Sequence, residues 1–256
     1  MAHWSNPGCV LITGASAGIG AALAREYAAP GRTLVLHGRD ATRLATLARE
    51  CEGRGARVVA LELDLRDGPA AVDALRQLSA AHVVDLAIVN AGVTSAIGQG
   101  EEVEDFARGR ELLAVNLDGA LATVAGVLPA MRQRASGQIA VMSSLAAYFG
   151  LPITPTYCAS KAALKAYGEA LRVWLAPQGV AVNVVMPGFV QTAMSASLAI
   201  PKPFMMGPER AARLIRAGLA RNRARIAFPF PFSWGAWWLS VLPPQISERL
   251  VRWLGY

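Results

Sequence analysis

Short apolar runs alternate with amphipathic segments along the first 190 residues of the chain. The runs are rich in Val, Leu and Ile, which favour strands, and apolar residues at helical spacing separate them. Strands are predicted at residues 9–13, 33–37, 57–63, 86–89, 138–142, 180–185 and 225–227. Helices are predicted at residues 20–29, 42–52, 106–132 and 156–175. Such alternation is typical of a parallel sheet with helices on both faces.

The length of 256 residues fits one large α/β domain better than two small ones. We expect a doubly wound parallel sheet over residues 1–227. Residues 228–256 are expected to form an extension of the same domain. Apolar residues make up 54 % of the chain and charged residues 17 %, which is enough apolar material to fill a core and excludes disorder as the main state.

The reactive side chains exclude several kinds of site. Three cysteines without a C-x-x-C spacing favour neither a disulfide scaffold nor a structural zinc site, and they suit a reducing compartment. Three widely spaced histidines give little material for a metal cluster, so no metal is expected. No targeting segment is recognised at the start, and the uncharged stretch at 173–201 is broken by Pro and Gly, as in a strand with loops. We therefore expect a cytoplasmic protein.

The net charge of +7 comes entirely from the end of the chain. Residues 1–201 carry 16 basic and 16 acidic side chains, whereas residues 202–256 carry 9 and 2. Four of the six tryptophans also lie in this last part. A neutral body with a basic, aromatic tail favours an acidic partner or a lipid surface. Because no recognition motif accompanies the charge, no nucleic-acid partner is expected.

A glycine-rich loop follows the first predicted strand and opens the first predicted helix. Its sequence is Thr13-Gly14-Ala15-Ser16-Ala17-Gly18-Ile19-Gly20. Glycines let a backbone approach a ligand closely, and a helix N-terminus presents free N–H groups to a diphosphate. The alternative is an ordinary glycine-rich turn.

A second candidate group combines a tyrosine and a lysine. Tyr157 and Lys161 are four residues apart in a predicted helix, so they share one face. A nearby ammonium favours the phenolate and lowers the pKa of a phenol, which makes Tyr a usable general acid and base. Ser144 lies 13 residues before Tyr157, at the end of a predicted strand, where open parallel sheets bind ligands. Taken alone, such a Tyr–Lys pair is more often a surface contact.

With these motifs at these mutual spacings, the chain resembles the short-chain dehydrogenases/reductases, which are oxidoreductases with a Rossmann-type fold. The resemblance covers about residues 8–227. It rests on the T-G-x-x-x-G-x-G form of the loop and on Asn116, Ser144, Tyr157 and Lys161, which match the family's Asn–Ser–Tyr–Lys tetrad.

The resemblance implies a role for each member of the tetrad. Tyr157 would exchange a proton with the substrate, and Ser144 would bind the carbonyl oxygen. Lys161 would hold the nicotinamide ribose and lower the pKa of Tyr157, and Asn116 would seat a water in a proton relay. Ser143 is adjacent to Ser144, and the register favours Ser144.

The resemblance also implies a set of cofactor-binding residues. Val89 stands where the family has the first Asn of its N-N-A-G box, a departure that removes a local hydrogen bond. Asp64 is either an adenine-binding residue or a strand-terminal cap. The cofactor-binding residues are Gly14, Ser16, Gly18, Ile19, Gly20, Arg39, Asp64, Leu65, Asn90, Ala91, Gly92, Tyr157, Lys161, Pro187, Gly188, Val190 and Thr192.

The end of the second predicted strand predicts the choice of cofactor. Sites specific for NAD place an acid there to bind the ribose 2′-hydroxyl, whereas an Arg accommodates a 2′-phosphate. Here Gly38 takes the position of the acid and Arg39 follows. We expect a preference for NADP(H), with NAD(H) possible if Asp40 serves as the acid and Arg39 is solvated.

Two apolar segments bear on the substrate. Residues 194–207 match the family insertion that covers the substrate, which implies an apolar ketone or alcohol, or they are a packing loop. Residues 228–256 hold four prolines too closely spaced for a bilayer span. Three interpretations of this tail stay open: cover for the substrate pocket or a neighbouring subunit, peripheral contact with the inner face of a membrane, or recruitment of an acidic carrier.

The sequence therefore predicts a single-domain oxidoreductase that transfers hydride between NADP(H) and a carbonyl or hydroxyl carbon. The alternatives are a non-catalytic NADP(H)-binding protein that docks through its tail, and an epimerase or dehydratase on the same scaffold. The family also implies a homo-oligomer formed through the two long helices.

Overall fold

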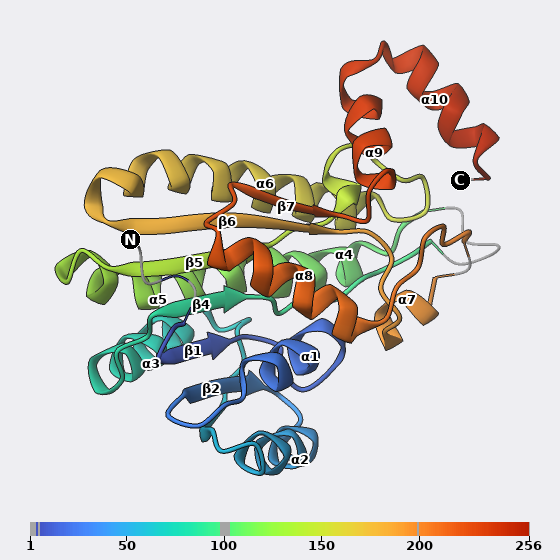
Figure 1. Cartoon of the computed structure of the whole chain (residues 1–256). Coiled ribbons are helices and arrows are strands. Elements are labelled where there is room, and N and C mark those ends of the chain that lie inside the picture. The colour runs from blue at the N-terminus through green and yellow to red at the C-terminus, as the bar shows by residue number, and fades with distance from the viewer. Residues whose placement is uncertain (1–3, 5, 98–102, 199, 256) are drawn as a thin grey trace.

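The computed structural model describes residue 4 and residues 6–97, 103–198 and 200–255. Its centre is one sheet with the strand order β3-β2-β1-β4-β5-β6-β7, in which every neighbouring pair is parallel (Figure 1). The strands are β1 (Cys9–Ile12), β2 (Thr33–Gly38), β3 (Arg57–Glu62), β4 (Leu86–Val89), β5 (Gly137–Met142), β6 (Val180–Pro187) and β7 (Arg225–Phe228). The predicted doubly wound parallel sheet is confirmed.

Helices cover both faces of the sheet (Figure 1). The longer ones are α1 (Gly18–Tyr27), α2 (Ala41–Glu52), α3 (Gly68–Ala81), α4 (Phe106–Leu113), α5 (Gly119–Gln133), α6 (Pro155–Leu175), α8 (Pro208–Ala220), α9 (Phe232–Val241) and α10 (Pro244–Trp253). The shorter ones are η2 (Ala114–Asp118), η3 (Leu145–Ala147), η4 (Ala176–Gln178) and α7 (Ala193–Ala196). Among the longer helices, α3, α8, α9 and α10 are not among the elements predicted from the sequence, and neither are the short helices η3, η4 and α7.

The pleat of each strand divides the core into two layers. In β1, Val10 and Ile12 pack in one layer with residues of α1, α2 and α8, whereas Leu11 packs in the other with residues of α3, α5 and α6. This follows from the alternation of side chains along a strand. Because both faces of the central strands are covered, β1, β4, β5 and β6 are buried along their whole length.

The predicted helix at 106–132 is continuous, but it contains the π-helical segment η2 between α4 and α5. Among the described residues, only Phe106–Gln133 is long and apolar enough to span a bilayer, and most of that segment is buried in the protein. It is therefore a core helix of the domain. The described residues of the uncharged stretch at 173–201 include the end of α6, η4, β6 and α7.

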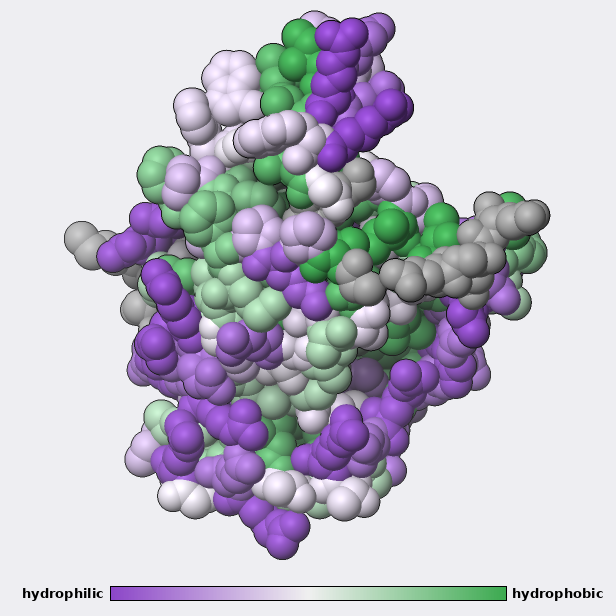
Figure 2. Space-filling view, turned by 90° about the vertical axis from the view of Figure 1, so that its right-hand side faces the viewer, coloured by the Kyte–Doolittle hydropathy of each residue, from purple (hydrophilic) through white to green (hydrophobic). Residues whose placement is uncertain are grey.

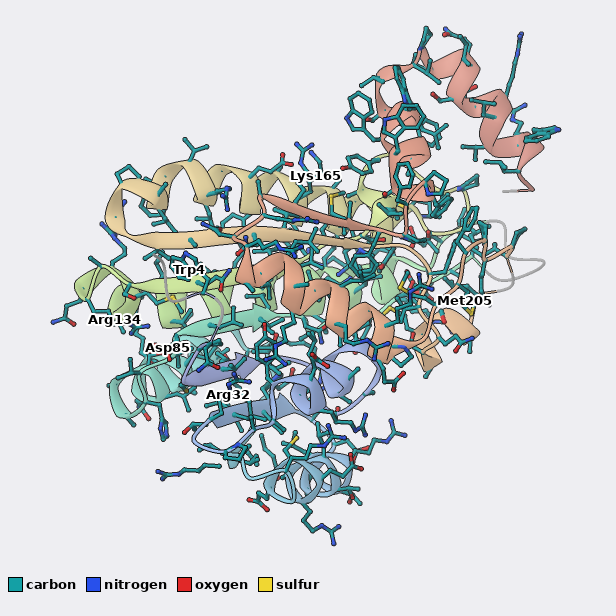
Figure 3. All side chains as sticks on the ribbon, in the orientation of Figure 1. Trp4, Arg32, Asp85, Arg134, Lys165 and Met205 are labelled. Carbon is teal, nitrogen blue, oxygen red and sulfur yellow. The ribbon has the colours of Figure 1, made fainter. Side chains whose placement is uncertain are left out.

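Side-chain hydrogen bonds fasten the amino ends of the strands. Asp85 accepts the N–H groups of Gly8 and Cys9 at 2.8 and 2.9 Å, which ties β4 to the start of β1. Arg134 donates to the carbonyl of Val84, and Arg32 donates to the carbonyl of Tyr27 at 2.9 Å. Figure 3 shows Asp85, Arg134 and Arg32 toward this end of the sheet and Met205 toward the other.

Helices α9 and α10, which we call the C-terminal hairpin, rise from the end of β7 and project beyond the sheet (Figure 1). Strand β7 includes Phe228, so the sheet runs one residue past the predicted boundary at 227. Helix α9 packs against the short helix η3, which follows β5, and both lie at the carboxyl ends of the strands.

Candidate active site

The glycine loop connects β1 to α1 in a tight turn. Gly14 and Gly18 have positive φ angles of 65° and 54°, a region that favours glycine. A Cβ on Gly20 would lie 2.2 Å from the carbonyl oxygen of Gly14, so no larger residue fits there without a shift. Ala17 is the N-cap of α1, and its side chain accepts no hydrogen bond from the first turn of the helix. The first backbone N–H groups are therefore uncapped by a side chain, and such groups can bind an anion.

Asn90 and Thr13 hold this loop against the end of β4. The Asn90 side-chain amide donates to the carbonyls of Thr13 and Gly14 at 2.9 and 3.2 Å. The Thr13 hydroxyl accepts the N–H groups of Asn90 and Ala91 at 2.9 and 3.1 Å. Val89, which departs from the family box, is buried in the core. The loops after β1 and β4 therefore form one rigid unit.

His37 is a part of this unit that the sequence analysis does not single out. Its Nδ1 accepts the Gly14 N–H at 3.2 Å, so Nε2 carries the proton and donates to the Leu63 carbonyl at 2.9 Å. Burial lowers the pKa of the imidazole, which keeps it neutral. A buried histidine therefore joins the glycine loop to the ends of β2 and β3, and its position just before Gly38-Arg39 is the only sequence signal for it.

The residues that bear on cofactor choice follow β2. Asp40 accepts the Arg43 N–H at 3.0 Å as the N-cap of α2, and its other oxygen pairs with Arg43 Nε at 3.1 Å. Arg39 is exposed at the edge of the cavity described below. A Cβ on Gly38 would lie 3.2 Å from Ser16 Cβ, so the strand end packs closely on the glycine loop.

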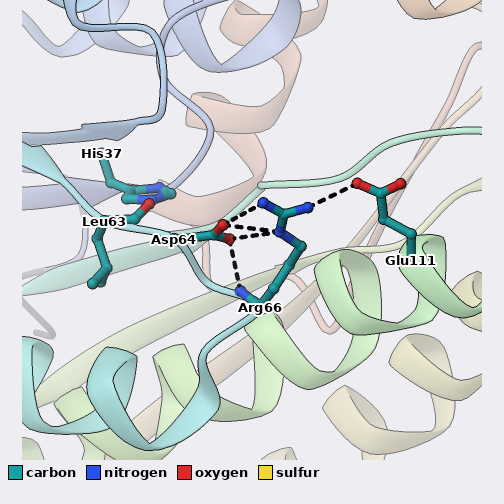
Figure 4. A network of polar contacts seen from close by, with 5 residues as sticks. All are labelled: His37, Leu63, Asp64, Arg66 and Glu111. Carbon is teal, nitrogen blue, oxygen red and sulfur yellow. Dashed lines mark hydrogen bonds and ion pairs between the residues drawn. The ribbon is translucent and has the colours of Figure 1, made fainter.

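Asp64 takes part in an ion-pair network (Figure 4). Its carboxylate accepts the Arg66 backbone N–H at 3.0 Å and Arg66 Nε at 2.9 Å, and Arg66 also pairs with Glu111 at 2.9 Å. These bonds hold the pKa of the Asp64 carboxyl at about 2. Asp64 is thus a cap for the residues after β3, as one of the two interpretations expects, and it also borders the cavity.

Ser144, Tyr157 and Lys161 meet where β5 ends and α6 begins. Ser144 lies near enough to the Tyr157 hydroxyl to influence its pKa, while the Ser144 hydroxyl itself donates to the Pro187 carbonyl at 3.4 Å and accepts the Ala146 N–H at 3.1 Å. Lys161 Nζ donates to the Met142 carbonyl at 3.1 Å and lies 5.6 Å from the centre of the Tyr157 ring. Ser143 points elsewhere, because its hydroxyl donates to the carbonyl of Lys161 at 2.7 Å. The register therefore brings Ser144, and not Ser143, to the phenol.

Burial dominates the protonation of this group. It raises the pKa of Tyr157 to about 12, although the Ser144 hydroxyl lowers it in part. Burial also lowers the pKa of Lys161 to about 8. In the protein by itself the pKa of Tyr157 is therefore raised, because desolvation of the phenolate is the largest cause. That Lys161 lowers the pKa of Tyr157 beside a bound cofactor stays a prediction.

Asn116 lies in η2 and acts as a brace. Its Oδ1 accepts the Val93 N–H at 2.7 Å, and its Nδ2 donates to the Val93 carbonyl at 3.0 Å and to Ser160 Oγ at 3.1 Å. The side chain is fully buried. A Cβ on Gly92 would lie 3.2 Å from Asn116 Oδ1 and 3.4 Å from Lys161 Nζ. Asn116 therefore fixes the loop after β4 against α6.

A single cavity of about 1260 Å³ connects these features. Most of the predicted site residues line it, whereas Asn116 and Gly20 lie behind its wall. The predicted residues that line it are Gly14, Ser16, Gly18, Ile19, Arg39, Asp64, Leu65, Asn90, Ala91, Gly92, Ser144, Tyr157, Lys161, Pro187, Gly188, Val190 and Thr192.

The other end of the cavity is apolar. Two aromatic contacts, Phe189–Phe232 and Phe204–Phe232, join the loops before α7 and α8 to α9, with ring centres 6.3 and 5.9 Å apart. Several lining residues lie outside the predicted site, because nothing in their local sequence marks them. They are Leu145, Phe149, Leu151, Phe189, Phe232, Ala236, Leu239, Leu250, Val251, Trp253 and Leu254. The C-terminal hairpin thus forms part of the wall, which agrees with the first interpretation of the tail.

The model of the short chain dehydrogenase family matches residues 8–202. An uncharacterized oxidoreductase of Myxococcus xanthus is 35 % identical over 243 residues, covering 94 % of this chain and 95 % of that protein. A very-long-chain 3-oxoacyl-CoA reductase of Neurospora crassa is 32 % identical over 249 residues, covering 94 % of this chain and 72 % of that protein.

Solved structures agree with these relatives. A short-chain dehydrogenase from Sphingobium yanoikuyae in complex with NADPH has a TM-score of 0.79 and 28 % identity, covering 89 % of this chain and 91 % of that one. The predicted family is therefore confirmed by the match over most of the chain, by the relatives and by the fold. This chain belongs to the short-chain dehydrogenase family and is an oxidoreductase of that family.

Proposed function

We propose that this protein transfers hydride between NADP(H) and the carbonyl or hydroxyl carbon of an apolar substrate, with Tyr157 as general acid and base. The observation that carries the proposal is the Ser144–Tyr157 hydroxyl pair beside Lys161, in a cavity with a glycine loop at one end and an apolar wall at the other. Ser144 follows the carboxyl end of β5 and Tyr157 lies at the start of α6, so both hydroxyls are at the edge where open parallel sheets bind ligands.

The glycine loop supports a dinucleotide site at one end of the cavity. Gly14 lets this loop pack closely on the loop after β4, since a Cβ there would lie 2.8 Å from Ala91 Cα. The N-terminus of α1 and Arg39 supply positive charge for phosphates, and Asp40 is occupied as a helix cap. When bound, the nicotinamide cofactor supplies or accepts the hydride. A structural relative with NADPH bound supports the same choice of cofactor.

Protonation states favour Tyr157 as the acid in the direction of reduction. With its pKa at about 12, the phenol is protonated at neutral pH and can give its proton to the carbonyl oxygen while the carbon gains hydride. Ser144 would hold that oxygen by a hydrogen bond. Lys161, with its pKa at about 8, is still charged at neutral pH and stabilises the phenolate that remains.

The apolar wall supports an apolar substrate. Leu145, Leu151 and Met194 line the cavity together with aromatic rings of the loops and the hairpin. Apolar walls with a few convergent polar groups are typical of sites that orient a small polar group on an otherwise apolar molecule. A relative named for the reduction of very-long-chain 3-oxoacyl-CoA supports a carbonyl on a long aliphatic chain.

The test removes the hydroxyl of Tyr157 and keeps its aromatic ring. Tyr157→Phe should lower kcat for NADPH-dependent reduction of a responsive ketone by about 10²–10⁴-fold, the range for loss of a general acid. The substrate is found by screening aliphatic, steroidal and acyl-thioester ketones and following NADPH absorbance. The Kd for NADPH, measured by fluorescence, should stay within about twofold, because the ring still packs in place.

Tyr148→Phe is the matched control, because Tyr148 is half-buried near the site but does not line the cavity. It should keep both turnover and cofactor binding. Full turnover by Tyr157→Phe would overturn the proposed role of the phenol.

A further inference from the structure

The C-terminal hairpin exposes an apolar stripe on its first helix. Trp234, Trp237, Trp238 and Val241 follow one another at helical spacing on one face of α9, and their exposed fractions are 56, 36, 40 and 52 %. The tryptophan rings meet edge-on, with centres 5.7 and 5.1 Å apart. None of these four side chains lines the cavity. The stripe is therefore separate from the cavity wall.

The second helix repeats this arrangement. Ile246, Leu250 and Trp253 lie one and two turns apart on α10 and are exposed, whereas Ser247 and Val251 are buried. The Ser247 hydroxyl donates to the Leu239 carbonyl at 2.9 Å, which ties α10 to α9. Each helix thus turns one face to its neighbours and leaves an apolar face without a partner in the part of the chain that the structure describes.

Basic side chains border the stripe on α10. Arg249 and Arg252 are exposed, and no ion pair joins either of them to another described residue. The only acidic residue of the hairpin is Glu248. Figure 2 shows hydrophobic side chains beside strongly hydrophilic ones on the projecting upper part of the molecule. The hairpin therefore combines exposed indoles with unpaired positive charge.

This combination decides between the possible partners. A second copy of the chain would bring the same arginines to the interface, where like charges repel. An anionic headgroup layer supplies the opposite charge over a broad area, and tryptophan and arginine both favour the boundary between headgroups and acyl chains. A patch of aromatic residues also exceeds the scattered apolar exposure of ordinary surfaces.

We propose that the C-terminal hairpin docks onto an anionic lipid bilayer, with the α9 stripe and the tryptophan end of α10 in the headgroup region. Because Leu250, Trp253 and Leu254 also line the cavity, docking would place the apolar end of the cavity beside the lipid surface. The docking itself does not depend on the proposed reaction.

The test is co-sedimentation of the full chain with vesicles of phosphatidylcholine, alone or mixed with phosphatidylglycerol. We expect at least about tenfold stronger partitioning onto the anionic vesicles, together with a blue shift of tryptophan fluorescence. The double variant Arg249→Gln, Arg252→Gln should remove most of this preference. The triple variant Trp234→Ser, Trp237→Ser, Trp238→Ser should bind at least about tenfold more weakly to both kinds of vesicle, because the indoles supply the apolar part.

Matched controls alter similar side chains elsewhere. Val173→Ser with Trp174→Ser removes exposed apolar residues of α6, and Arg57→Gln with Arg221→Gln removes two exposed charges far from the hairpin. Both controls should bind vesicles as the wild type does. Equal loss of binding in the controls would overturn the docking proposal, as would equal partitioning of the wild type onto neutral and anionic vesicles. A dimer that forms without lipid and is lost in the triple variant would also overturn it, in favour of self-association.

Discussion

The glycine-loop end of the cavity is held by hydrogen bonds between loops, whereas the apolar end is formed by side chains on short helices. Asn90, Thr13 and His37 together bind the loops after β1, β2, β3 and β4 into one unit. At the other end, Phe232 meets Phe204 and Phe189 only through ring contacts. Directional bonds fix positions to a fraction of an ångström, while apolar contacts tolerate rearrangement.

This difference suggests that the two ends of the cavity have different tasks. A dinucleotide and a proton donor need fixed geometry, because the reacting atoms must be held in line. An apolar substrate needs only a large enough cavity from which water is excluded. Substitutions at the glycine-loop end should therefore affect binding and stability together, whereas those at the apolar end should affect neither strongly. The predictions below test that contrast from the largest effect to the smallest.

Gly20→Ala should be the most damaging change. The new methyl group would lie 2.2 Å from the Gly14 carbonyl oxygen and 2.7 Å from Asn90 Nδ2, so the loop and its brace must both move. We expect a loss of more than about 3 kcal/mol in the free energy of unfolding and no measurable binding of NADPH. Urea denaturation and fluorescence titration measure these effects. Gly68→Ala, in α3 at a position with no neighbour within 4 Å of the added methyl, is the control: it should leave NADPH binding unchanged and should not lower the free energy of unfolding.

Lys161 should make stability depend on pH in a specific direction. Burial lowers the pKa of the folded protein's Lys161 to about 8 from the ordinary value of 10.5, so the folded protein buries a cation below pH 8 at a cost. Between about pH 8 and 10 the unfolded chain binds more protons than the folded one, and stability therefore rises with pH. The free energy of unfolding of the wild type, minus that of Lys161→Met, should increase by about 3 kcal/mol across this window.

Urea denaturation of both proteins at several pH values measures that difference. Because Tyr157 titrates in both proteins, its own pKa does not enter the comparison to first order. A difference that stays flat from pH 7 to pH 10 would contradict burial as the cause of the shift.

The sequence predicts the polar end of the cavity better than the apolar end. The strands and the glycine loop follow from local patterns, and Tyr157 and Lys161 lie on one face because they are one helical turn apart. Of the helices that were not predicted, α3 buries only Ala71, Leu75 and Ser79, whereas α8 has an apolar face that includes Ile215 and Leu219 and that the sequence analysis does not use. No local pattern tells which apolar loop residues will face a cavity.

Long-range contacts account for the remaining differences. His37 lies in an ordinary strand pattern, and its role arises only because Gly14 and Leu63 reach it from two other elements. The pKa of Tyr157 likewise depends on how deeply the fold buries the ring, which a spacing of residues does not contain. The spacing brings the phenol and the ammonium together, but it does not contain the burial that raises the pKa of the phenol in the protein by itself.

Arg39→Gln should change the choice of cofactor with a moderate effect. A charged hydrogen bond to a 2′-phosphate contributes about 1.5–3 kcal/mol, so kcat/KM for NADPH should fall by about 10–100-fold. The value for NADH should change by less than about threefold, because NADH has no 2′-phosphate. Asp40→Asn is the control. An Asn side chain can still cap α2, so this variant should not lower kcat/KM for NADH. A marked fall in that value would show that Asp40 binds the ribose.

The smallest effect is expected at the apolar end of the cavity. It is a gain in the free energy of unfolding, whereas Gly20→Ala should cause a loss. Gly235 lies within α9 and borders the cavity, yet an added methyl group would meet no atom within 4 Å. Alanine is a better helix former than glycine by about 1 kcal/mol, so Gly235→Ala should raise the free energy of unfolding by up to that amount. NADPH binding should be unchanged, because the hairpin is remote from the glycine loop. If Gly235→Ala instead weakened NADPH binding, the two ends of the cavity would be coupled, and the apolar end could not be altered independently of the cofactor end.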